Sequence, residues 1–305
     1  MKKIIVCTTI NPPTEAIEKY DALPDWLLIV VGDHKTPDSY RLKNGIYLSP
    51  DDQVKISSKL SDLIGWNCIQ RRNFGLLYAY NLGAEVICTV DDDNIPLANW
   101  GKELLINSSL TIKQYNTNQV AFDPIGSTNY KNLWHRGFPL ELIPSRNYED
   151  SSIIEIVPDI QADFWNGDPD IDAICRLEHK PECEFNDDDF PFTSSKFSPF
   201  NSQNTFINRK VAADYFLFPH IGRMDDIWAA YYVLSKGNKV VYNKATVYQE
   251  RNFHNLLDDM KKEYIGYENN LSLINDLYKD PEKILKYLPE RSIDAWNTYR
   301  SLLDQ

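Results

Sequence analysis

Apolar runs and segments of helical periodicity alternate along the first hundred residues of the chain. The segments Lys3–Thr9, Trp26–Val31 and Val86–Val90 form three such runs, and each is predicted to be a strand. Runs with so few polar positions are typical of strands that are buried on both faces of a sheet. Helices are predicted over Thr14–Leu23 and Asn67–Leu82, between these strands. The alternation predicts a parallel, doubly wound α/β sheet.

The pattern is less regular beyond this first part of the chain. Four further strands are predicted, at Gln119–Phe122, Ile153–Val157, Asn201–Ile207 and Val240–Tyr248. From Leu256 onward, apolar stripes beside charged faces predict helices. We therefore expect an α/β domain over residues 1–252 and a C-terminal helical extension over residues 253–305.

The composition narrows the classes of function. With 32 basic and 44 acidic residues, the net charge of −12 argues against a nucleic acid or an anionic membrane as the partner. The five cysteines lack CxxC spacing, which is typical of reduced cytosolic thiols. No apolar run reaches the length of about 18 residues that a membrane-spanning helix needs. We therefore expect a cytoplasmic protein without an integral membrane segment, and a homo-oligomer stays open.

Three aspartates, Asp91, Asp92 and Asp93, directly follow the Val86–Val90 strand. Carboxylates about 5 Å apart repel each other by roughly 3 kcal/mol at an effective dielectric constant near 20, so this strand end favours a neutralising cation. Mg²⁺ or Mn²⁺ fits, because these ions bind carboxylates together with phosphate oxygens. Alternation along an extended chain makes Asp91 and Asp93, on one side, the predicted metal ligands. The alternative is a solvated acidic loop.

Ligands of doubly wound sheets bind at the C-terminal ends of the strands. The residues predicted there as nucleotide-binding are Thr8, Thr9, Asn11, Asp33, Lys35, Arg71, Arg72, Asn73 and Asp92. Arg72 lies on the apolar stripe of its predicted helix, where a guanidinium needs an anion as partner. Two compatible interpretations stay open for Arg72: an internal ion pair with an aspartate, or a cation facing a diphosphate.

Two later segments suit the binding of a sugar. The segment Leu133–Leu140 is basic and aromatic and contains a glycine, whereas Gln161–Asp172 ends in a turn rich in Asp and Gly. From these segments, the residues predicted to bind the substrate are Arg136, Gly137, Asp168 and Asp170. Asn204, in the predicted strand Asn201–Ile207, is predicted to bind it as well. The alternatives are a guanidinium stacked on aromatic rings for packing and an ordinary surface loop.

Two further acids, Asp225 and Asp226, open a predicted helix that continues with Trp228. Acids in the first turn interact favourably with the helix dipole, which would account for them without a catalytic role. Asp226 next to an aromatic platform also suits a catalytic base. We predict Asp226, Asp225 and Arg136 as the catalytic residues.

A second run of three aspartates, Asp187–Asp189, lies within the segment Glu178–Phe192. No apolar strand precedes these acids. Charge runs of this kind are usually solvated, so we predict an exposed excursion of the chain.

Several motifs carry a resemblance to known families. RRNFGLLYAYNLGAEVICTVDDDNIP, HRGFPLEL, DFWNGDPDIDA, NSQNTFINRK and GRMDDIWAA resemble, in order and spacing, the reversibly glycosylated polypeptides of plants, which interconvert the pyranose and furanose forms of UDP-arabinose. GDHKTPDSYRLKNGIYLSPDDQ, NLGAEVI, RGFPLEL and FNSQNTFI resemble the STELLO family of glycosyltransferases. Together the resemblances cover most of residues 3–270.

The resemblance implies a GT-A-like fold, in which a doubly wound mixed sheet has a Rossmann-like nucleotide-binding half and is followed by the C-terminal helical extension. It implies that Asp91 and Asp93 bind the metal and the diphosphate, and that Asp226 lies near the sugar or the acceptor. Arg136 would be the counterpart of the arginine that becomes glycosylated in the mutase family. The DDDNIP motif is nearer to the mutases, whereas the N-terminal third is nearer to STELLO.

The sequence therefore predicts a metal-dependent glycosyltransferase of glycan or polysaccharide biosynthesis. It would use Mn²⁺ or Mg²⁺, a nucleotide-activated sugar such as a UDP-sugar, and a glycan or small-molecule acceptor. The metal, Arg71 and Arg72 would neutralise the leaving diphosphate, and Asp226 would deprotonate the acceptor. Two alternatives stay open: a UDP-sugar pyranose–furanose mutase, and a non-catalytic nucleotide-sugar-binding subunit.

Overall fold

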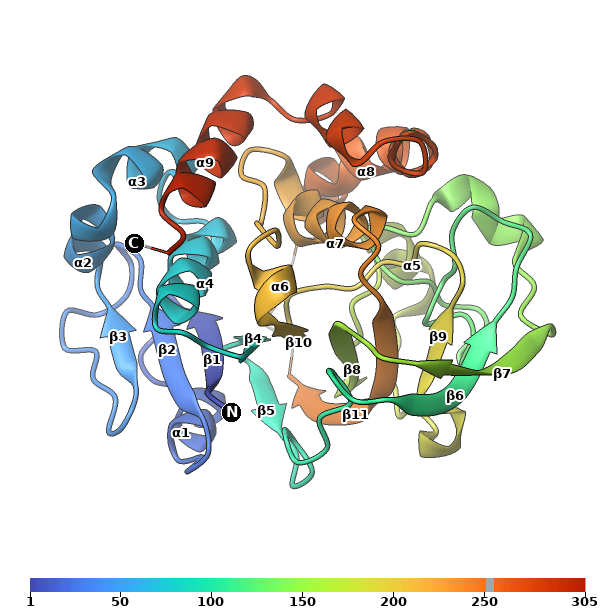
Figure 1. Ribbon diagram of the computed structural model, residues 1–305, viewed down its shortest axis with the longest axis horizontal. Helices are drawn as coiled ribbons and strands as arrows, with labels where there is room; N and C mark the ends of the chain where they lie inside the picture. Colours follow the sequence, from blue (N-terminus) through green and yellow to red (C-terminus); the bar gives the residue numbers. More distant parts are fainter. Residues whose placement is uncertain (251–254, 305) are drawn as a thin grey trace.

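The computed structural model describes residues 1–250 and 255–304 of the chain, so the domain boundary predicted at 252/253 lies outside the described residues. A mixed sheet of 11 strands crosses the centre in the order β3-β2-β1-β4-β10-β8-β11-β9-β6-β7, with β5 paired to β11 (Figure 1). The strands are β1 (Lys3–Thr8), β2 (Leu27–Val31), β3 (Ile46–Leu48), β4 (Val86–Asp91), β5 (Asn94–Pro96), β6 (Leu110–Tyr115), β7 (Ser151–Ile156), β8 (Ile160–Gly167), β9 (Phe192–Ser194), β10 (Asn204–Asn208) and β11 (Val240–Gln249). The predicted α/β class is confirmed.

Helices pack around this sheet. The α-helices are α1 (Glu15–Asp21), α2 (Pro50–Ile56), α3 (Ser58–Ile64), α4 (Arg72–Asn81), α5 (Ala173–His179), α6 (Arg209–Ala212), α7 (Asp225–Ser235), α8 (Leu256–Leu277) and α9 (Glu290–Ser301). The 3₁₀ helices are η1 (Ile69–Arg71), η2 (Leu140–Ser145), η3 (Asp187–Asp189), η4 (Gly222–Met224) and η5 (Pro281–Lys286). In Figure 1, α4, α6 and α7 lie above the central strands, and α8 and α9 form an outer layer above them.

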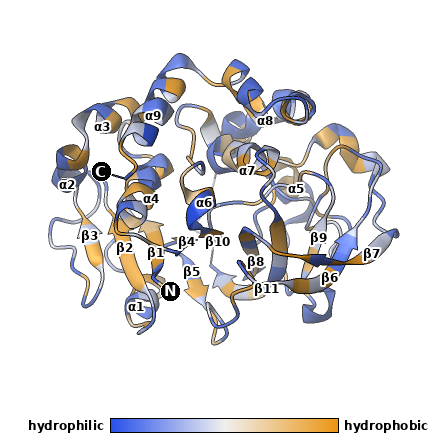
Figure 2. Cartoon of the chain, in the orientation of Figure 1, coloured by the Kyte–Doolittle hydropathy of each residue, from blue (hydrophilic) through white to orange (hydrophobic). Residues whose placement is uncertain are grey.

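The first four strands of the sheet are parallel, as the sequence pattern predicts. Strand β1 lies between β2 and β4, and its register places Thr8 level with both Val31 and Asp91. The apolar residues of β1 and β2 are buried, except for the partly buried Leu27, and these strands are coloured hydrophobic in Figure 2. The C-terminal ends of β1, β2 and β4 therefore meet at one rim of the sheet. Beyond β4 the direction changes, because β10 runs antiparallel to β4 and β8.

One predicted strand does not form. Within Gln119–Phe122, Ala121 forms an isolated bridge to Phe197, and β6 and β7 lie on either side of this segment in the sequence. The ring of Phe122 instead stacks on Tyr115, with 5.4 Å between the ring centroids. The prediction was wrong because a short apolar run marks burial and cannot by itself distinguish a strand from a buried loop.

The C-terminal helices share the hydrophobic core of the α/β layer. The fully buried ring of Trp296 on α9 packs edge-on against Phe218 and Tyr232, with 5.2 and 4.8 Å between ring centroids. On α8, Asn270 accepts a hydrogen bond of 2.9 Å from the indole of Trp228 on α7. The extension predicted over residues 253–305 thus packs onto the layer that carries α7. In the described part of the chain, no helix is both long and apolar enough to cross a membrane.

Candidate active site

Two adjoining cavities open at the rim where β1, β2 and β4 end. The first, here called the β1–β2 cavity, has a volume of about 290 Å³ and is lined by Thr8, Asn11, Asp33 and Asp92, among others. The second, the α7 cavity, has a volume of about 220 Å³. Its polar lining includes Asp91, Asp93, Arg136, Gln203, Asp225 and Asp226. Ile69 lines both cavities and is 40% exposed, so the two cavities are neighbours.

The three acids after β4 are divided between these cavities. Asp92 lines the β1–β2 cavity, whereas Asp91 and Asp93 line the α7 cavity, which is the alternation that an extended chain predicts. The carboxylate of Asp92 accepts hydrogen bonds from the Thr9 hydroxyl (2.5 Å) and the Asn11 amide (3.0 Å). Burial raises the pKa of Asp92. The strand end therefore presents one acid to one side and two acids to the other.

Arg72 forms the internal ion pair that was one of its two predicted interpretations. Its fully buried guanidinium donates to the Asp91 carboxylate at 2.5 Å and to the Ser202 hydroxyl at 2.6 Å. It also donates to the Thr8 hydroxyl at 3.2 Å. Asp91 is partly exposed and lines the α7 cavity. Arg72 does not line this cavity itself and is linked to it through its ion pair with Asp91.

Among the described residues, the predicted metal ligands Asp91 and Asp93 have few other possible protein ligands around them. Over residues 1–250 and 255–304, no group of three or more His, Cys, Asp or Glu side chains is arranged to hold a metal ion. Asp91 and Asp93 supply two carboxylates to one cavity, and the Gln249 amide donates to Asp93 at 3.4 Å. Mg²⁺ commonly binds one or two carboxylates together with waters and substrate phosphates. The residues present therefore fit a metal that the substrate helps to bind, and they do not form a cage made of protein ligands alone.

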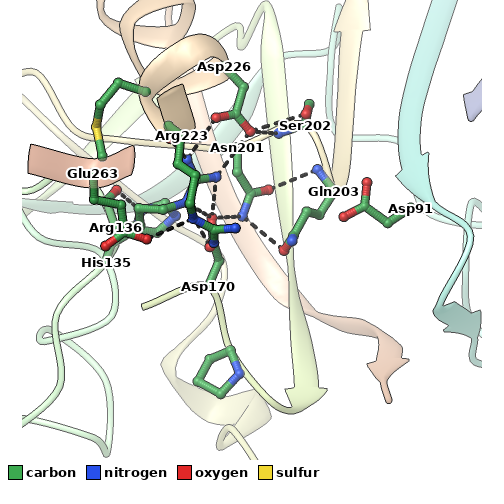
Figure 3. A network of polar contacts seen from close by, with 12 residues as sticks. Asp91, His135, Arg136, Asp170, Asn201, Ser202, Gln203, Arg223, Asp226 and Glu263 are labelled. Carbon is green, nitrogen blue, oxygen red and sulfur yellow. Dashed lines mark hydrogen bonds and ion pairs between the residues drawn. The ribbon is translucent and has the colours of Figure 1, made fainter. Parts of the chain in front are cut away.

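Arg136 is held between two carboxylates in the wall of the α7 cavity (Figure 3). Its Nε and Nη2 atoms donate to Asp170 at 2.9 and 2.8 Å, and Nη1 and Nη2 donate to Asp226 at 3.0 and 3.2 Å. Nη1 also donates to the carbonyl of Arg223. Burial opposes the charge, but Asp170 and Asp226 raise the pKa of Arg136 well above its ordinary value. Arg136 is therefore a guanidinium cation with every nitrogen engaged.

Residues far apart in the sequence support this arrangement. The Asn201 amide donates to Asp170 at 2.8 Å, and the Ser202 backbone N–H donates to Asp226 at 2.9 Å. On α8, Glu263 accepts a hydrogen bond of 2.8 Å from Nε of Arg223 (Figure 3). The C-terminal helices thus help to position η4, which precedes α7 and contacts Arg136.

Arg71 lines the β1–β2 cavity, but most of its contacts are internal. Its Nε donates to Gln53 at 2.7 Å, Nη1 donates to the Ser61 hydroxyl at 3.1 Å, and the guanidinium lies 3.6 Å from the ring centre of Trp66. Its buried Nη2 atom has no hydrogen-bond acceptor among the described residues. Lys35 is exposed and is not part of either cavity wall.

Two residues predicted at the site lie away from both cavities because the surrounding backbone uses their side chains. The Asn73 amide donates to the Leu217 carbonyl at 2.8 Å and accepts from the Leu217 N–H at 2.9 Å. The fully buried Asn204 donates to the Thr246 hydroxyl at 2.9 Å and accepts from the Trp100 indole at 3.0 Å. These placements do not support ligand binding by Asn73 or Asn204.

Gly137 and Asp168, two of the predicted sugar-binding residues, have contacts within the protein that explain them without a sugar. Gly137 has a φ of +90°, and a Cβ atom there would lie 2.2 Å from the side chain of Ile227. This glycine allows α7 to pack closely, which explains it without a sugar. Asp168 forms an ion pair with Arg176 and is not part of the α7 cavity wall, whereas Asp170 reaches the site through Arg136.

Several residues of the cavity walls were missed from the sequence. These are Gln249, which ends β11, and Ser202 and Gln203, which precede β10. Gln70 in η1 lines neither cavity but contacts a residue of the wall. The Gln70 amide donates to Asp225 at 2.9 Å. A polar residue directly after an apolar run was the available signal for Gln249, the same signal that identified Asp91–Asp93.

No family model matches the chain. The chain is 28% identical over 223 residues to the probable glycosyltransferase STELLO1 of Arabidopsis thaliana, and 26% identical over 223 residues to STELLO2 of the same plant. The chain is similar to probable glycosyltransferases. The predicted resemblance to the STELLO family is confirmed.

The extent of these similarities is limited. Each match covers 67% of this chain and 29% of the relative, so the chain spans less than a third of the length of the curated relatives it matches. Among solved structures, glucosyl-3-phosphoglycerate synthase from Mycobacterium tuberculosis, in complex with phosphoglyceric acid, matches with a TM-score of 0.48 and 10% identity. That match covers 90% of this chain and 80% of the other.

Proposed function

We propose that the protein is a glycosyltransferase that uses a nucleotide-activated sugar, in particular a UDP-sugar, in the synthesis of a glycan. One observation carries the proposal: the acids Asp91–Asp93 lie between two adjoining cavities, at the ends of parallel strands. A diphosphate bound at these acids would place its nucleoside in the β1–β2 cavity and its sugar in the α7 cavity. The similarity to the STELLO proteins supports the same reaction class.

The β1–β2 cavity has the features that a nucleoside needs. Its polar groups include Thr9, Asn11 and Asp33, which suit hydroxyl and base-edge contacts. Ile10 and Ile69 line the same cavity and are 48% and 40% exposed, so apolar walls are available to a planar base. Ligand sites typically combine such apolar walls with a few polar groups that fix orientation.

The diphosphate would lie at the strand end. Asp91 and Asp93 would hold Mn²⁺ or Mg²⁺ in this proposal, and the ion would neutralise charge on the leaving diphosphate. Arg72 holds the Asp91 carboxylate in place through its buried ion pair. The Nη2 atom of Arg71, which finds no hydrogen-bond acceptor in the described part of the chain, is a further candidate donor toward the nucleotide.

The state of Arg136 favours a transferase over a mutase. A mutase of the reversibly glycosylated type needs this arginine as a nucleophile, and a guanidinium is a poor nucleophile while it is protonated. Asp170 and Asp226 hold the charge on Arg136 and occupy its nitrogens. Arg136 would therefore organise the sugar end of the site and would not form a covalent bond to the sugar.

The test is turnover of UDP-glucose, UDP-galactose, UDP-xylose and UDP-arabinopyranose, with Mn²⁺ or with EDTA, without and with a panel of methyl glycosides as acceptors. We expect release of UDP that requires the metal and increases with acceptor, and no mass increment on the protein. A stoichiometric pentose or hexose adduct on the Arg136 peptide would instead support the mutase. Binding of UDP without any turnover would support a non-catalytic subunit.

A further inference from the structure

The two acids at the start of α7, Asp225 and Asp226, line the same cavity but differ in their contacts. The Asp226 carboxylate accepts two hydrogen bonds from Arg136, at 3.0 and 3.2 Å, and two from Ser202, at 2.9 Å from the backbone N–H and 3.1 Å from the hydroxyl. An ionised carboxylate has about four lone-pair sites. Asp226 therefore has little capacity left for a proton from a substrate.

The Asp225 carboxylate still has lone pairs that can accept a proton from a substrate. Among the described residues, it accepts one hydrogen bond from a side chain, the Gln70 amide at 2.9 Å, and one from the backbone N–H of Asp226. The charged groups that face it in this part of the chain are Asp226 on its own helix, Arg136 from the loop before η2, and Arg223 on η4. Burial, followed by the charge of Asp226, raises the pKa of Asp225 to about 7.

We propose that Asp225, and not Asp226, is the general base for glycosyl transfer, and that Asp226 is a positioning residue that holds Arg136 and Ser202. This inference rests on the proposed function. In the step, the acceptor oxygen bonds to the anomeric carbon while the bond from that carbon to the diphosphate oxygen breaks. The electron pair leaves with the nucleoside diphosphate, and the acceptor proton passes to the Asp225 carboxylate, which later loses it to water.

The properties of Asp225 suit this role for a physical reason. A general base works best when its pKa lies near the working pH, because it is then ionised and still accepts a proton readily. The Asp226 carboxylate already accepts four hydrogen bonds from Arg136 and Ser202, so its lone pairs are not available to the acceptor. Gln70 lies in η1 next to Ile69, which lines both cavities, so the segment that borders the donor also orients the base.

The experiment compares two isosteric variants, Asp225→Asn and Asp226→Asn, with the UDP-sugar that the wild type turns over fastest and with both water and methyl glycosides as acceptors. For the wild type we expect transfer to rise with pH toward pH 7. Asp225→Asn should lower kcat about 100-fold or more, abolish this rise and leave UDP affinity in calorimetry unchanged. Asp226→Asn should keep the rise and move it to lower pH, since its charge helps to raise the pKa of Asp225.

Thermal melting against pH checks that the variants fold. The folded pKa of Asp225, about 7, lies above the unfolded value of about 3.9, so ionisation of this group destabilises the fold as pH rises between these values. Asp225→Asn should therefore melt above the wild type at pH 8, whereas Asp226→Asn should melt below it, because Arg136 loses a charged partner.

The outcomes separate the two proposals. UDP release by the wild type, together with a folded Asp225→Asn variant that keeps its rate and its pH dependence, would overturn the assignment of the base and leave the transferase intact. No UDP release by the wild type from any of the four donors would overturn the proposed function, and the base with it.

Discussion

The chain contains two runs of three aspartates, Asp91–Asp93 at the end of β4 and Asp187–Asp189 in η3. The first run receives hydrogen bonds from three separate elements, through Arg72, Thr9 and Gln249. None of the three acids in the second run is buried. Identical tripeptides therefore differ in their contacts and burial because of what precedes and surrounds them.

The cause of the difference is the buried strand. Val86–Val90 is buried throughout and is paired on both sides, with β1 and β10, so the chain leaves it at a fixed place. The neighbouring helix α4 brings Arg72 to the same place. In η3 the preceding residue is the exposed Asn186, which caps the turn by accepting a hydrogen bond of 3.3 Å from the Asp188 N–H. Acids without a buried strand behind them remain hydrated and need no partner.

The largest expected effect is the loss of the ion pair beneath the first run. Arg72→Leu removes a fully buried cation and leaves Asp91 and the Ser202 carbonyl without their donor. Breaking a buried pair on one side costs about 3–5 kcal/mol, and we expect the lower end because Asp91 is partly exposed. Chemical denaturation measures this change in the free energy of unfolding. An unchanged stability with weakened UDP binding would show that Arg72 serves the diphosphate directly.

The second expected effect concerns ligand binding. Asp93→Ala should remove the Mn²⁺-dependent part of UDP affinity, about 10-fold or more, because one of two predicted carboxylate ligands is lost. Asp189→Ala, in the second run, is the matched control and should leave UDP affinity as in the wild type. Calorimetry in Mn²⁺ and in EDTA measures both. Equal UDP affinity of the wild type in Mn²⁺ and in EDTA would contradict the metal site.

Those parts of the site that lie in neighbouring elements could be predicted from the sequence. Asp91–Asp93 and Arg72 lie in neighbouring elements, and their meeting follows from the buried strand and from the stripe of the helix before it. The acidic excursion at Asp187–Asp189 could be predicted from the absence of such a strand. The parallel first half of the sheet follows from the same local patterns.

The position of Arg136 between two carboxylates could not be predicted in the same way. Its partners Asp170 and Asp226 lie 34 and 90 residues away in the sequence, and no periodicity links the three segments. Asn204 illustrates the opposite case, because it was predicted to bind the substrate. It instead hydrogen-bonds Trp100 and Thr246 within the sheet, since a buried amide needs partners wherever it lies.

The smallest expected effect comes from the second run itself. Replacing Asp187, Asp188 and Asp189 together by Asn changes the net charge from −12 to −9 and removes no buried contact of their side chains. Stability should change by no more than about 0.5 kcal/mol, as for other exposed positions. UDP is an anion, so its binding should tighten slightly at low salt and not at 0.15 M, where charges are screened beyond about 8 Å. Calorimetry at both salt concentrations measures this difference. A loss of UDP affinity at 0.15 M would give the exposed run a function of its own and would end the contrast with Asp91–Asp93.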